Sequence, residues 1–268
     1  MLARLLALAR PVIMGVVNVT PDSFSDGGRF LDPQRAIEHA RQLAAEGADI
    51  LDIGAESTRP YGGMVAVSRE EELRRLAPVL PEITALGVPV SIDTMKASVA
   101  SAALAAGASI VNDVWGLQRD PDMARVVAEH AVPIIMMHNR DAVDPAIDIM
   151  ADISAFFARS LDIAERAGIA RDTIVLDPGI GFGKTPEQSM QAIARLDSFK
   201  RFGLPLLVGA SRKRFIDKVS PAPPDRRIGG SLAAHLAAVA VGAAIVRTHD
   251  VAETVQALRV AAAIGGAR

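Results

Sequence analysis

The chain has 268 residues, half of them hydrophobic, and a formal net charge of −2, so it lacks the basic surface that nucleic-acid binding requires. It has no cysteine, which excludes disulfides and thiolate chemistry. No apolar run approaches the roughly 18 residues of a membrane span. We therefore expect a cytoplasmic protein without a nucleic-acid or membrane partner, in which local groups bind any anionic ligand.

The first half of the chain alternates short apolar runs with helical patterns. The opening segment, MLARLLALAR, carries two arginines and is expected to be a lead-in to the first strand. Ser68, followed by Glu71, forms a capping box that predicts the start of a helix. Another helix is expected to open at Asp32-Pro33. The first five strands are expected at 12–19, 48–55, 88–93, 109–114 and 132–138.

The second half continues the alternation with the runs TIVLDPG, LPLLVGAS and AAIVRTH. The first of these leads into DPGIGFGK and the second into SRKRF. A proline-rich segment, VSPAPPDRR, precedes a helix at about 229–241, and a last helix is expected at 251–264. The strands are nearly continuous Val/Ile/Leu runs, which is typical of a parallel sheet buried on both faces.

A polar residue stands at or just past the end of every apolar run. Eight strand–helix repeats of this kind predict an α/β protein with one (β/α)8 barrel domain over 1–268, and its site at the carboxyl ends of the strands. The alternative is an open doubly wound sheet, but the polar loop after every repeat favours the barrel. The eight residues are Asn18, Thr58, Asp93, Asn112, His138, Asp177, Lys213 and His249.

The carboxylates at the strand ends suggest a ligand rich in N–H donors. Asp93 and Asp177 can each accept two hydrogen bonds, and Asn112 can both donate and accept. Together they suit a flat heterocycle. The alternative is that each Asp only caps the helix that follows it.

The basic residues after strands seven and eight suggest an anion site. Arg247 and His249 end a buried strand, and Lys213 follows its neighbour, in the region where barrels often bind phosphate. Arg212 and Arg214 are expected to be a solvated rim. His138 is expected to be structural, and DPGIGFGK fits neither the P-loop nor the Rossmann spacing.

Seven segments, in order along almost the whole chain, carry a resemblance to a known family: NVTPDSFSDGG (18–28), ESTRP (56–60), SIDT (91–94), VNDV (111–114), LDPGIGFGK (176–184), SRK (211–213) and RTH (247–249). Together they resemble the dihydropteroate synthases of the pterin-binding barrel superfamily. The resemblance implies condensation of 4-aminobenzoate with (7,8-dihydropterin-6-yl)methyl diphosphate, which gives 7,8-dihydropteroate and diphosphate in folate biosynthesis. It also implies Mg²⁺ as cofactor and sulfonamides as inhibitors of the class.

The same resemblance implies roles for individual residues. The catalytic set is Asp93, Lys213, Arg247 and His249. The pterin contacts are Asp93, Asn112, Asp177 and Lys213, and the diphosphate contacts are Thr58, Arg247 and His249. Asn18 would bind Mg²⁺, and Asp26 and Arg59 would order the first two loops. The 4-aminobenzoate slot would be built by Phe24, Thr58, Pro60, Phe182 and Lys213.

Two departures from the family pattern stand out. Tyr61-Gly62-Gly63 replaces the usual Gly-Ala after Pro60, and TPEQSM replaces a segment in which an Asn-Leu pair is more usual. The first leaves sulfonamide response open, so a sulfonamide-insensitive form is one alternative. The others are a non-catalytic pterin-binding paralogue and a methyltetrahydrofolate:corrinoid methyltransferase. The family usually forms homodimers, here through the helices at 229–241 and 251–264.

Overall fold

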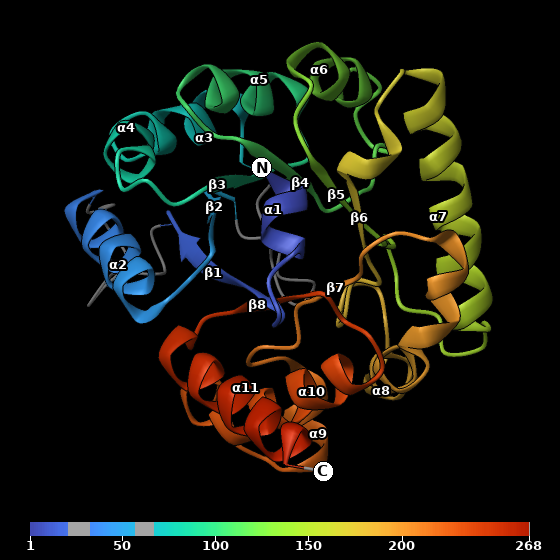
Figure 1. Cartoon of the computed structure of the whole chain (residues 1–268). Helices are drawn as coiled ribbons and strands as arrows, with labels where there is room; N and C mark the ends of the chain where they lie inside the picture. The colour runs from blue at the N-terminus through green and yellow to red at the C-terminus, as the bar shows by residue number, and fades with distance from the viewer. Residues whose placement is uncertain (21–32, 57–66, 268) are drawn as a thin grey trace.

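The computed structural model describes residues 1–20, 33–56 and 67–267. Its eight parallel strands form one sheet in the order β6-β5-β4-β3-β2-β1-β8-β7, and a bridge between Leu176 and Leu206 joins the two edges. Helices surround the resulting (β/α)8 barrel (Figure 1). The predicted barrel is confirmed, and the open doubly wound sheet is excluded.

The strands fall inside the predicted apolar runs but are shorter at their ends. The pairs are parallel throughout, as expected for strands joined by helical crossovers. The strands are β1 (Val12–Asn18), β2 (Ile50–Gly54), β3 (Val90–Asp93), β4 (Ile110–Asp113), β5 (Ile134–Met137), β6 (Ile174–Asp177), β7 (Leu207–Val208) and β8 (Ile245–Thr248).

The helices lie outside the sheet and bury their apolar faces against it, except for the first helix. Those after β1 to β5 are α2 (Pro33–Glu46), α3 (Arg69–Leu76), α4 (Leu80–Thr84), α5 (Ala97–Ala105), α6 (Met123–His130) and α7 (Ile149–Arg166). Those after β6 to β8 are α8 (Pro186–Ala194), α9 (Arg214–Val219), α10 (Ile228–Ala240) and α11 (Val251–Gly266). In the described part of the chain, no helix is both long enough and apolar enough to cross a bilayer.

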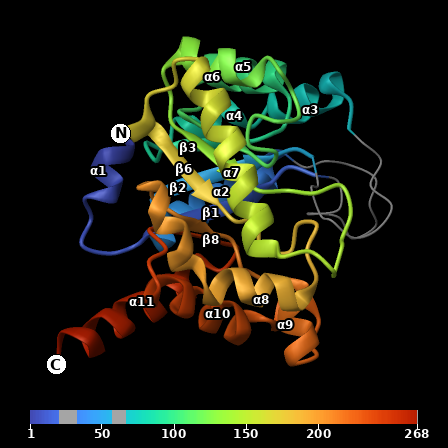
Figure 2. The ribbon, with the colours of Figure 1, turned by 90° about the vertical axis from the view of Figure 1, so that its right-hand side faces the viewer.

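The first residues, expected as a lead-in to the first strand, form a short helix, α1 (Leu2–Leu6). This helix lies at one end of the barrel (Figure 2). Leu2 is only 4% exposed, because it packs on an apolar cluster inside the barrel that includes Val12, Ile50 and Ile245. These three residues begin or nearly begin their strands, so α1 covers the amino-terminal end of the barrel.

Two helix starts show how local contacts decide a cap. At α3 the Ser68 hydroxyl accepts the Glu71 N–H at 3.2 Å, but the Glu71 carboxylate pairs with Arg74 and Arg75. The predicted capping box is therefore only half formed, because the two guanidinium groups compete for that carboxylate. At α8 the box is complete, between Thr185 and Gln188.

Candidate active site

The alternation of side chains along each strand places the polar groups inside the barrel. Ile50, Ile110, Val175 and Ile245 belong to the apolar cluster under which α1 lies. Because side chains on a strand alternate between its two faces, the residues two positions further on also point inward, nearer the carboxyl end. Those residues are Asp52, Asn112, Asp177 and Arg247.

Arg247 joins two buried carboxylates at the centre of this layer. Its Nε donates to Asp52 Oδ2 at 2.6 Å, and its Nη2 donates to Asp93 Oδ2 at 2.8 Å. Asn112 donates from Nδ2 to the same Asp52 oxygen at 3.1 Å. Strands β2, β3, β4 and β8 therefore share one hydrogen-bonded cluster.

The second oxygen of the Asp52 carboxylate and that of the Asp93 carboxylate accept no hydrogen bond from Arg247. Asp52 Oδ1 and Asp93 Oδ1 are buried and have no hydrogen-bond partner among the described residues. Burial raises the pKa of Asp93 to about 7, against the opposing effect of Arg247 and with the help of the nearby Asp52 charge. A buried carboxylate oxygen without a donor is costly unless a ligand supplies the donor.

Asp177 lies on the opposite side of the layer, at the start of the glycine-rich turn. Its Oδ1 accepts the Gly179 N–H at 2.7 Å, and burial raises its pKa to about 6. Further along the turn, the Phe182 ring lies 4.0 Å from Lys213 Nζ. The turn approaches so closely that a Cβ on Gly181 would lie 3.3 Å from the Lys213 side chain. The turn thus brings an acceptor, an aromatic face and a cation to one side of the mouth.

His249 lies just past the end of β8, two residues after Arg247. Its Nδ1 lies 2.9 Å from the Ser211 hydroxyl, which also accepts the His249 backbone N–H at 3.2 Å. Ser211 therefore ties the end of β8 to the loop after β7, where Lys213 is the residue just before α9. This arrangement groups the three predicted cationic or imidazole side chains along adjoining segments.

Asn18 belongs to the same rim. In the sheet it pairs with Gly54 of β2, which pairs with Asp93 of β3, which in turn pairs with Asn112 of β4. Within the described ranges, no group of three His, Asp or Glu side chains could hold a metal ion. Among the described rim residues, Asn18 offers a neutral amide oxygen that could bind an ion together with oxygens from a ligand.

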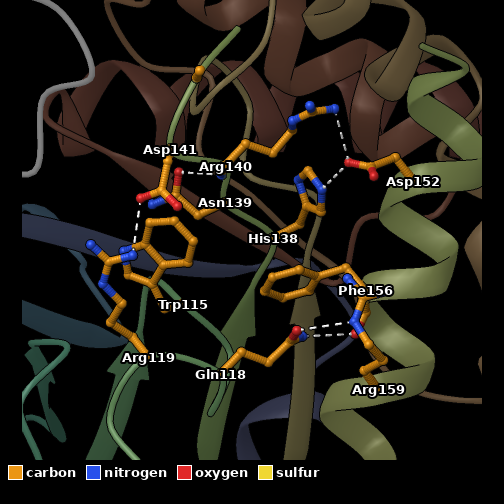
Figure 3. A pocket seen from close by; sticks show the side chains of 11 residues that line it. Trp115, Gln118, Arg119, His138, Asn139, Arg140, Asp141, Asp152, Phe156 and Arg159 are labelled. Carbon is orange, nitrogen blue, oxygen red and sulfur yellow. Dashed lines mark hydrogen bonds and ion pairs between the residues drawn. The ribbon is translucent and has the colours of Figure 1, made fainter. Parts of the chain in front are cut away.

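The hollow between these groups is small. It is lined by Asp93, Asn112, Asp177, Phe182, Lys213 and Arg247, among others, and its volume is about 20 Å³. A bicyclic ligand needs more space than this hollow offers. A larger cavity of about 540 Å³ lies beside β5 and α7 and contains none of the predicted site residues except His138, which was expected to be structural (Figure 3).

The structure brings together all the predicted site residues that it describes. Asn18, Asp93, Asn112, Asp177, Phe182, Lys213, Arg247 and His249 lie at the same end of the barrel. Phe24, Asp26, Thr58, Arg59 and Pro60 lie outside the described residues, as does Tyr61.

Two residues differ from what the sequence predicted. Arg212 is not part of a solvated rim, because its Nε donates to Asp250 at 3.1 Å and its side chain is half-buried. Asp52 was missed, although it is the acid in the middle of the apolar run ADILDIGA, three residues after Asp49. That break in the run, at an inward-facing position, is the signal that could have found it.

Comparison with known proteins decides the family. The pterin binding enzyme family matches residues 14–249. The chain belongs to this family. A dihydropteroate synthase of Bacillus subtilis is 47% identical over 90% of this chain and 84% of its own length. Its similarity to dihydropteroate synthases over most of its length makes the protein an enzyme, a transferase of folate biosynthesis, as the sequence motifs predicted.

Solved structures of dihydropteroate synthases agree with the fold as well as the sequence. The enzyme of Clostridium difficile, solved in the presence of pteroic acid, is 46% identical, with a TM-score of 0.90 over 96% of this chain and 97% of that chain. The enzyme of Xanthomonas albilineans, solved with 4-aminobenzoic acid, is 45% identical, with a TM-score of 0.91 over 96% and 94%. The pterin-binding barrel thus extends over nearly the whole chain.

Proposed function

We propose that this protein joins 4-aminobenzoate to (7,8-dihydropterin-6-yl)methyl diphosphate, and that residues 1–268 act as one barrel domain in doing so. The amine nitrogen forms a bond to the methylene carbon, the C–O bond breaks, diphosphate takes the electron pair, and the amine releases a proton. The observation that carries the proposal is the pair of buried carboxylate oxygens beside Arg247, Asp52 Oδ1 and Asp93 Oδ1, to which no described residue donates.

The pterin site follows from the hydrogen-bonding capacity of the inner layer. A pterin presents N–H donors along one edge, and Asp93, Asp177 and Asn112 offer acceptors at the carboxyl ends of β3, β6 and β4. If the C–O bond breaks before the amine attacks, positive charge develops on the pterin. The buried Asp93 carboxylate stabilises that charge strongly, since water does not screen it. Lys213 closes the site from the loop after β7.

The diphosphate site adjoins the pterin site at Arg247, which also contacts Asp93. Arg247 supplies a planar fork of donors for phosphate oxygens, and His249 adds an imidazole held by Ser211. We place Thr58 in the same contact. Because Arg247 also binds Asp52 and Asp93, it is held in place before the substrate arrives.

The donor set at the rim fits Mg²⁺ that arrives with the diphosphate. Mg²⁺ prefers oxygen ligands and commonly keeps several waters while it binds substrate phosphates, so it needs few protein ligands, and the amide oxygen of Asn18 would be one of them. Bound there, the ion would neutralise charge on the leaving group. The chain's own contribution is to position that oxygen in register with Gly54 and, through it, Asp93.

The 4-aminobenzoate slot rests on Phe182 and Lys213, which already face each other. Phe24, Thr58 and Pro60 would complete it, and Asp26 and Arg59 would order the loops that carry them. Competition between a sulfonamide and 4-aminobenzoate tests the effect of Tyr61 on this slot. Tight inhibition would exclude the sulfonamide-insensitive form.

A homodimer is the assembly we propose. Helix α11 exposes Val260 and Ile264, one helical turn apart, so this helix presents apolar side chains to solvent. Light scattering on the purified protein should give twice the chain mass, and substitution of Val260 and Ile264 by serine should lower it. The cytoplasmic location expected from the sequence stays a prediction.

The decisive experiment is diphosphate release with Mg²⁺, with and without 4-aminobenzoate, in wild type and Asp93→Asn. We expect release that 4-aminobenzoate stimulates and that matches dihydropteroate formation, and a loss of roughly a hundredfold or more in the variant. Pterin binding without turnover would instead identify the non-catalytic paralogue. Methyl transfer from methyltetrahydrofolate would identify the corrinoid methyltransferase.

A further inference from the structure

Lys184, at the end of the glycine-rich turn, is fully buried, and the proposed reaction gives it no role. Its Nζ donates to the carbonyl oxygens of Gly179 at 2.8 Å and Phe182 at 3.0 Å. It also lies 2.7 Å from His138 Nδ1. An ammonium group has three N–H donors, and these three acceptors match them.

The contact with Lys184 fixes the tautomer of His138. Because an ammonium group can only donate, His138 Nδ1 must accept, and the ring proton is then on Nε2. His138 Nε2 lies 3.0 Å from Asp152 Oδ2, to which it can donate (Figure 3). Burial lowers the pKa of His138 to about 4, in agreement with a neutral ring. The ammonium is thus linked through a neutral imidazole to a carboxylate.

Asp152, the last residue of this hydrogen-bonded series from Lys184, lies in the wall of the cavity of about 540 Å³ (Figure 3). The side chain of Asp152 is 36% exposed, and Arg140 also contacts it, at 3.3 Å. Asp141 lines the same cavity and pairs with Arg119, but it does not belong to the chain from Lys184. The cavity thus offers two accessible carboxylates, of which one is connected to the buried lysine.

At the other end of the hydrogen-bonded series, Lys184 holds the glycine-rich turn beside the site residues Asp177 and Phe182. The N–H of Gly179 donates to Asp177 Oδ1, while its carbonyl accepts from Lys184. The carbonyl of Phe182 also accepts from Lys184, while its ring faces Lys213. A Cβ on Gly179 would come within 2.0 Å of the His138 carbonyl oxygen, so the turn fits closely against the end of β5.

We propose that Lys184, acting through His138 and Asp152, is a positioning residue that holds the turn 178–183 so that Phe182 and Asp177 face the substrates. The identity of those substrates rests on the proposed function, but the anchoring of the turn does not. Lys184 touches neither substrate in this arrangement, so its loss should alter substrate binding more than the chemical step.

The charged groups around Lys184 predict how pH affects this anchor. The carboxylates of Asp177 and Asp152 favour its charged form, whereas Lys213 and Arg140 oppose it. Burial dominates and lowers the pKa of Lys184 to about 7. As the pH rises past that value, the lysine loses one donor and the turn loosens. Removal of the Asp152 charge should move this loosening to lower pH.

The first test is amide hydrogen exchange of the segment 178–184 in the free protein, measured against wild type at each pH from 6 to 9. Lys184→Met should raise the exchange rate about tenfold, the effect of losing hydrogen bonds made by a charged group. Asp152→Asn should raise it less, with the largest excess over wild type near and below pH 7 and little excess at pH 9, where Lys184 is neutral in both proteins. Asp141→Asn, the matched control in the same cavity, should leave it unchanged.

The second test is kinetic. Lys184→Met and Asp152→Asn should raise KM for 4-aminobenzoate, the former roughly tenfold, with kcat within about twofold of wild type. Unchanged exchange in both variants, or equal changes in Asp141→Asn, would overturn the proposal. If Lys184→Met fails to fold, Asp152→Asn decides. A wild type without synthase activity would refute the proposed function and leave the exchange result standing.

Discussion

Two buried charged clusters at the carboxyl end of the barrel differ in whether their polar atoms have partners. In the cluster around Arg247, Asp52 Oδ1 and Asp93 Oδ1 have none among the described residues. In the chain from Lys184 to Asp152, the ammonium has three acceptors, and both nitrogens of the intervening His138 have partners.

We interpret the cluster around Arg247 as the ligand-binding site and the series from Lys184 to Asp152 as a structural element that holds the site in place. A cluster whose hydrogen bonds are complete has nothing to offer a ligand and serves to rigidify the chain around it. A cluster with buried acceptors left over gains stability when a ligand supplies donors. Both clusters meet at Asp177, which belongs to the first by its position and to the second through Gly179.

The largest expected effect is that of Arg247→Ala on stability. The variant leaves the Asp52 and Asp93 carboxylates buried without their cation, and such losses destabilise proteins by about 3–5 kcal/mol. Urea unfolding of wild type and variant measures it. Arg212→Ala, which breaks the more exposed pair with Asp250, should have a smaller effect. A loss below about 1 kcal/mol in Arg247→Ala would show that the first cluster does not depend on its arginine.

Asp52→Asn should weaken pterin binding while it spares the fold. The amide oxygen can still accept from Arg247, but the other atom becomes a donor where the ligand needs an acceptor. We expect the dissociation constant of the pterin substrate, measured by calorimetry, to rise roughly ten- to a hundredfold. Ser91→Ala, which removes another buried oxygen without a described partner, should change it by less than about twofold. An equal rise in the dissociation constant for both variants would contradict a hydrogen bond from the pterin to Asp52 Oδ1.

The pH dependence of binding and of stability should run in opposite directions. Burial raises the pKa of Asp177 to about 6 and that of Asp93 to about 7, above the value of about 3.9 for an unfolded Asp. As the pH falls through 7 and 6, these acceptors take up protons and pterin binding should weaken. Between about pH 6 and 4 the folded protein binds more protons than the unfolded chain, so both groups add stability as the pH falls.

Calorimetry and urea unfolding between pH 8 and 5 measure the two trends. Asp177→Asn is the reference, since it removes one titration, and the wild type should gain stability relative to it below about pH 6. Pterin affinity that is constant or improves as the pH falls would contradict the assignment of these carboxylates as acceptors.

The smallest effect is expected at the exposed pair of Arg119 and Asp141 in the cavity wall. Asp141→Asn should change the free energy of unfolding by less than about 0.5 kcal/mol, because water screens the pair. This value sets the scale for Asp152→Asn, which removes the same charge from the same cavity. Similar exchange and unfolding data for the two variants would mean that Asp152 does not stabilise the turn through His138 and Lys184.

Much of the fold could be predicted from the sequence because strand ends and helix faces are local patterns. The apolar runs placed all eight strands to within a few residues, and Asp93, Asn112 and Asp177 were predicted at strand ends, where the structure has them. The parallel barrel then brings such ends together from distant parts of the chain. The prediction of a common site mouth needed only this geometry.

Other features depended on contacts that no local pattern specifies. Lys184 looked like part of a glycine-rich segment, but its partner His138 lies 46 residues earlier. Arg212 looked like a solvated residue until Asp250, from the loop after β8, paired with it. Glu71 had the spacing of a capping box, yet Arg74 and Arg75 attracted its carboxylate. In each case a long-range packing arrangement or a competing charge decided the outcome.

Helix α1 limits the route by which substrates enter the barrel and products leave it. With Leu2 packed on Val12, Ile50 and Ile245, the amino-terminal end of the barrel is sealed by apolar side chains. Diphosphate and dihydropteroate must then depart by the end through which the substrates arrive. A new pterin substrate can bind only after diphosphate from the previous turnover has dissociated. Added diphosphate should therefore inhibit competitively with the pterin substrate, and slow diphosphate release would lower the turnover rate.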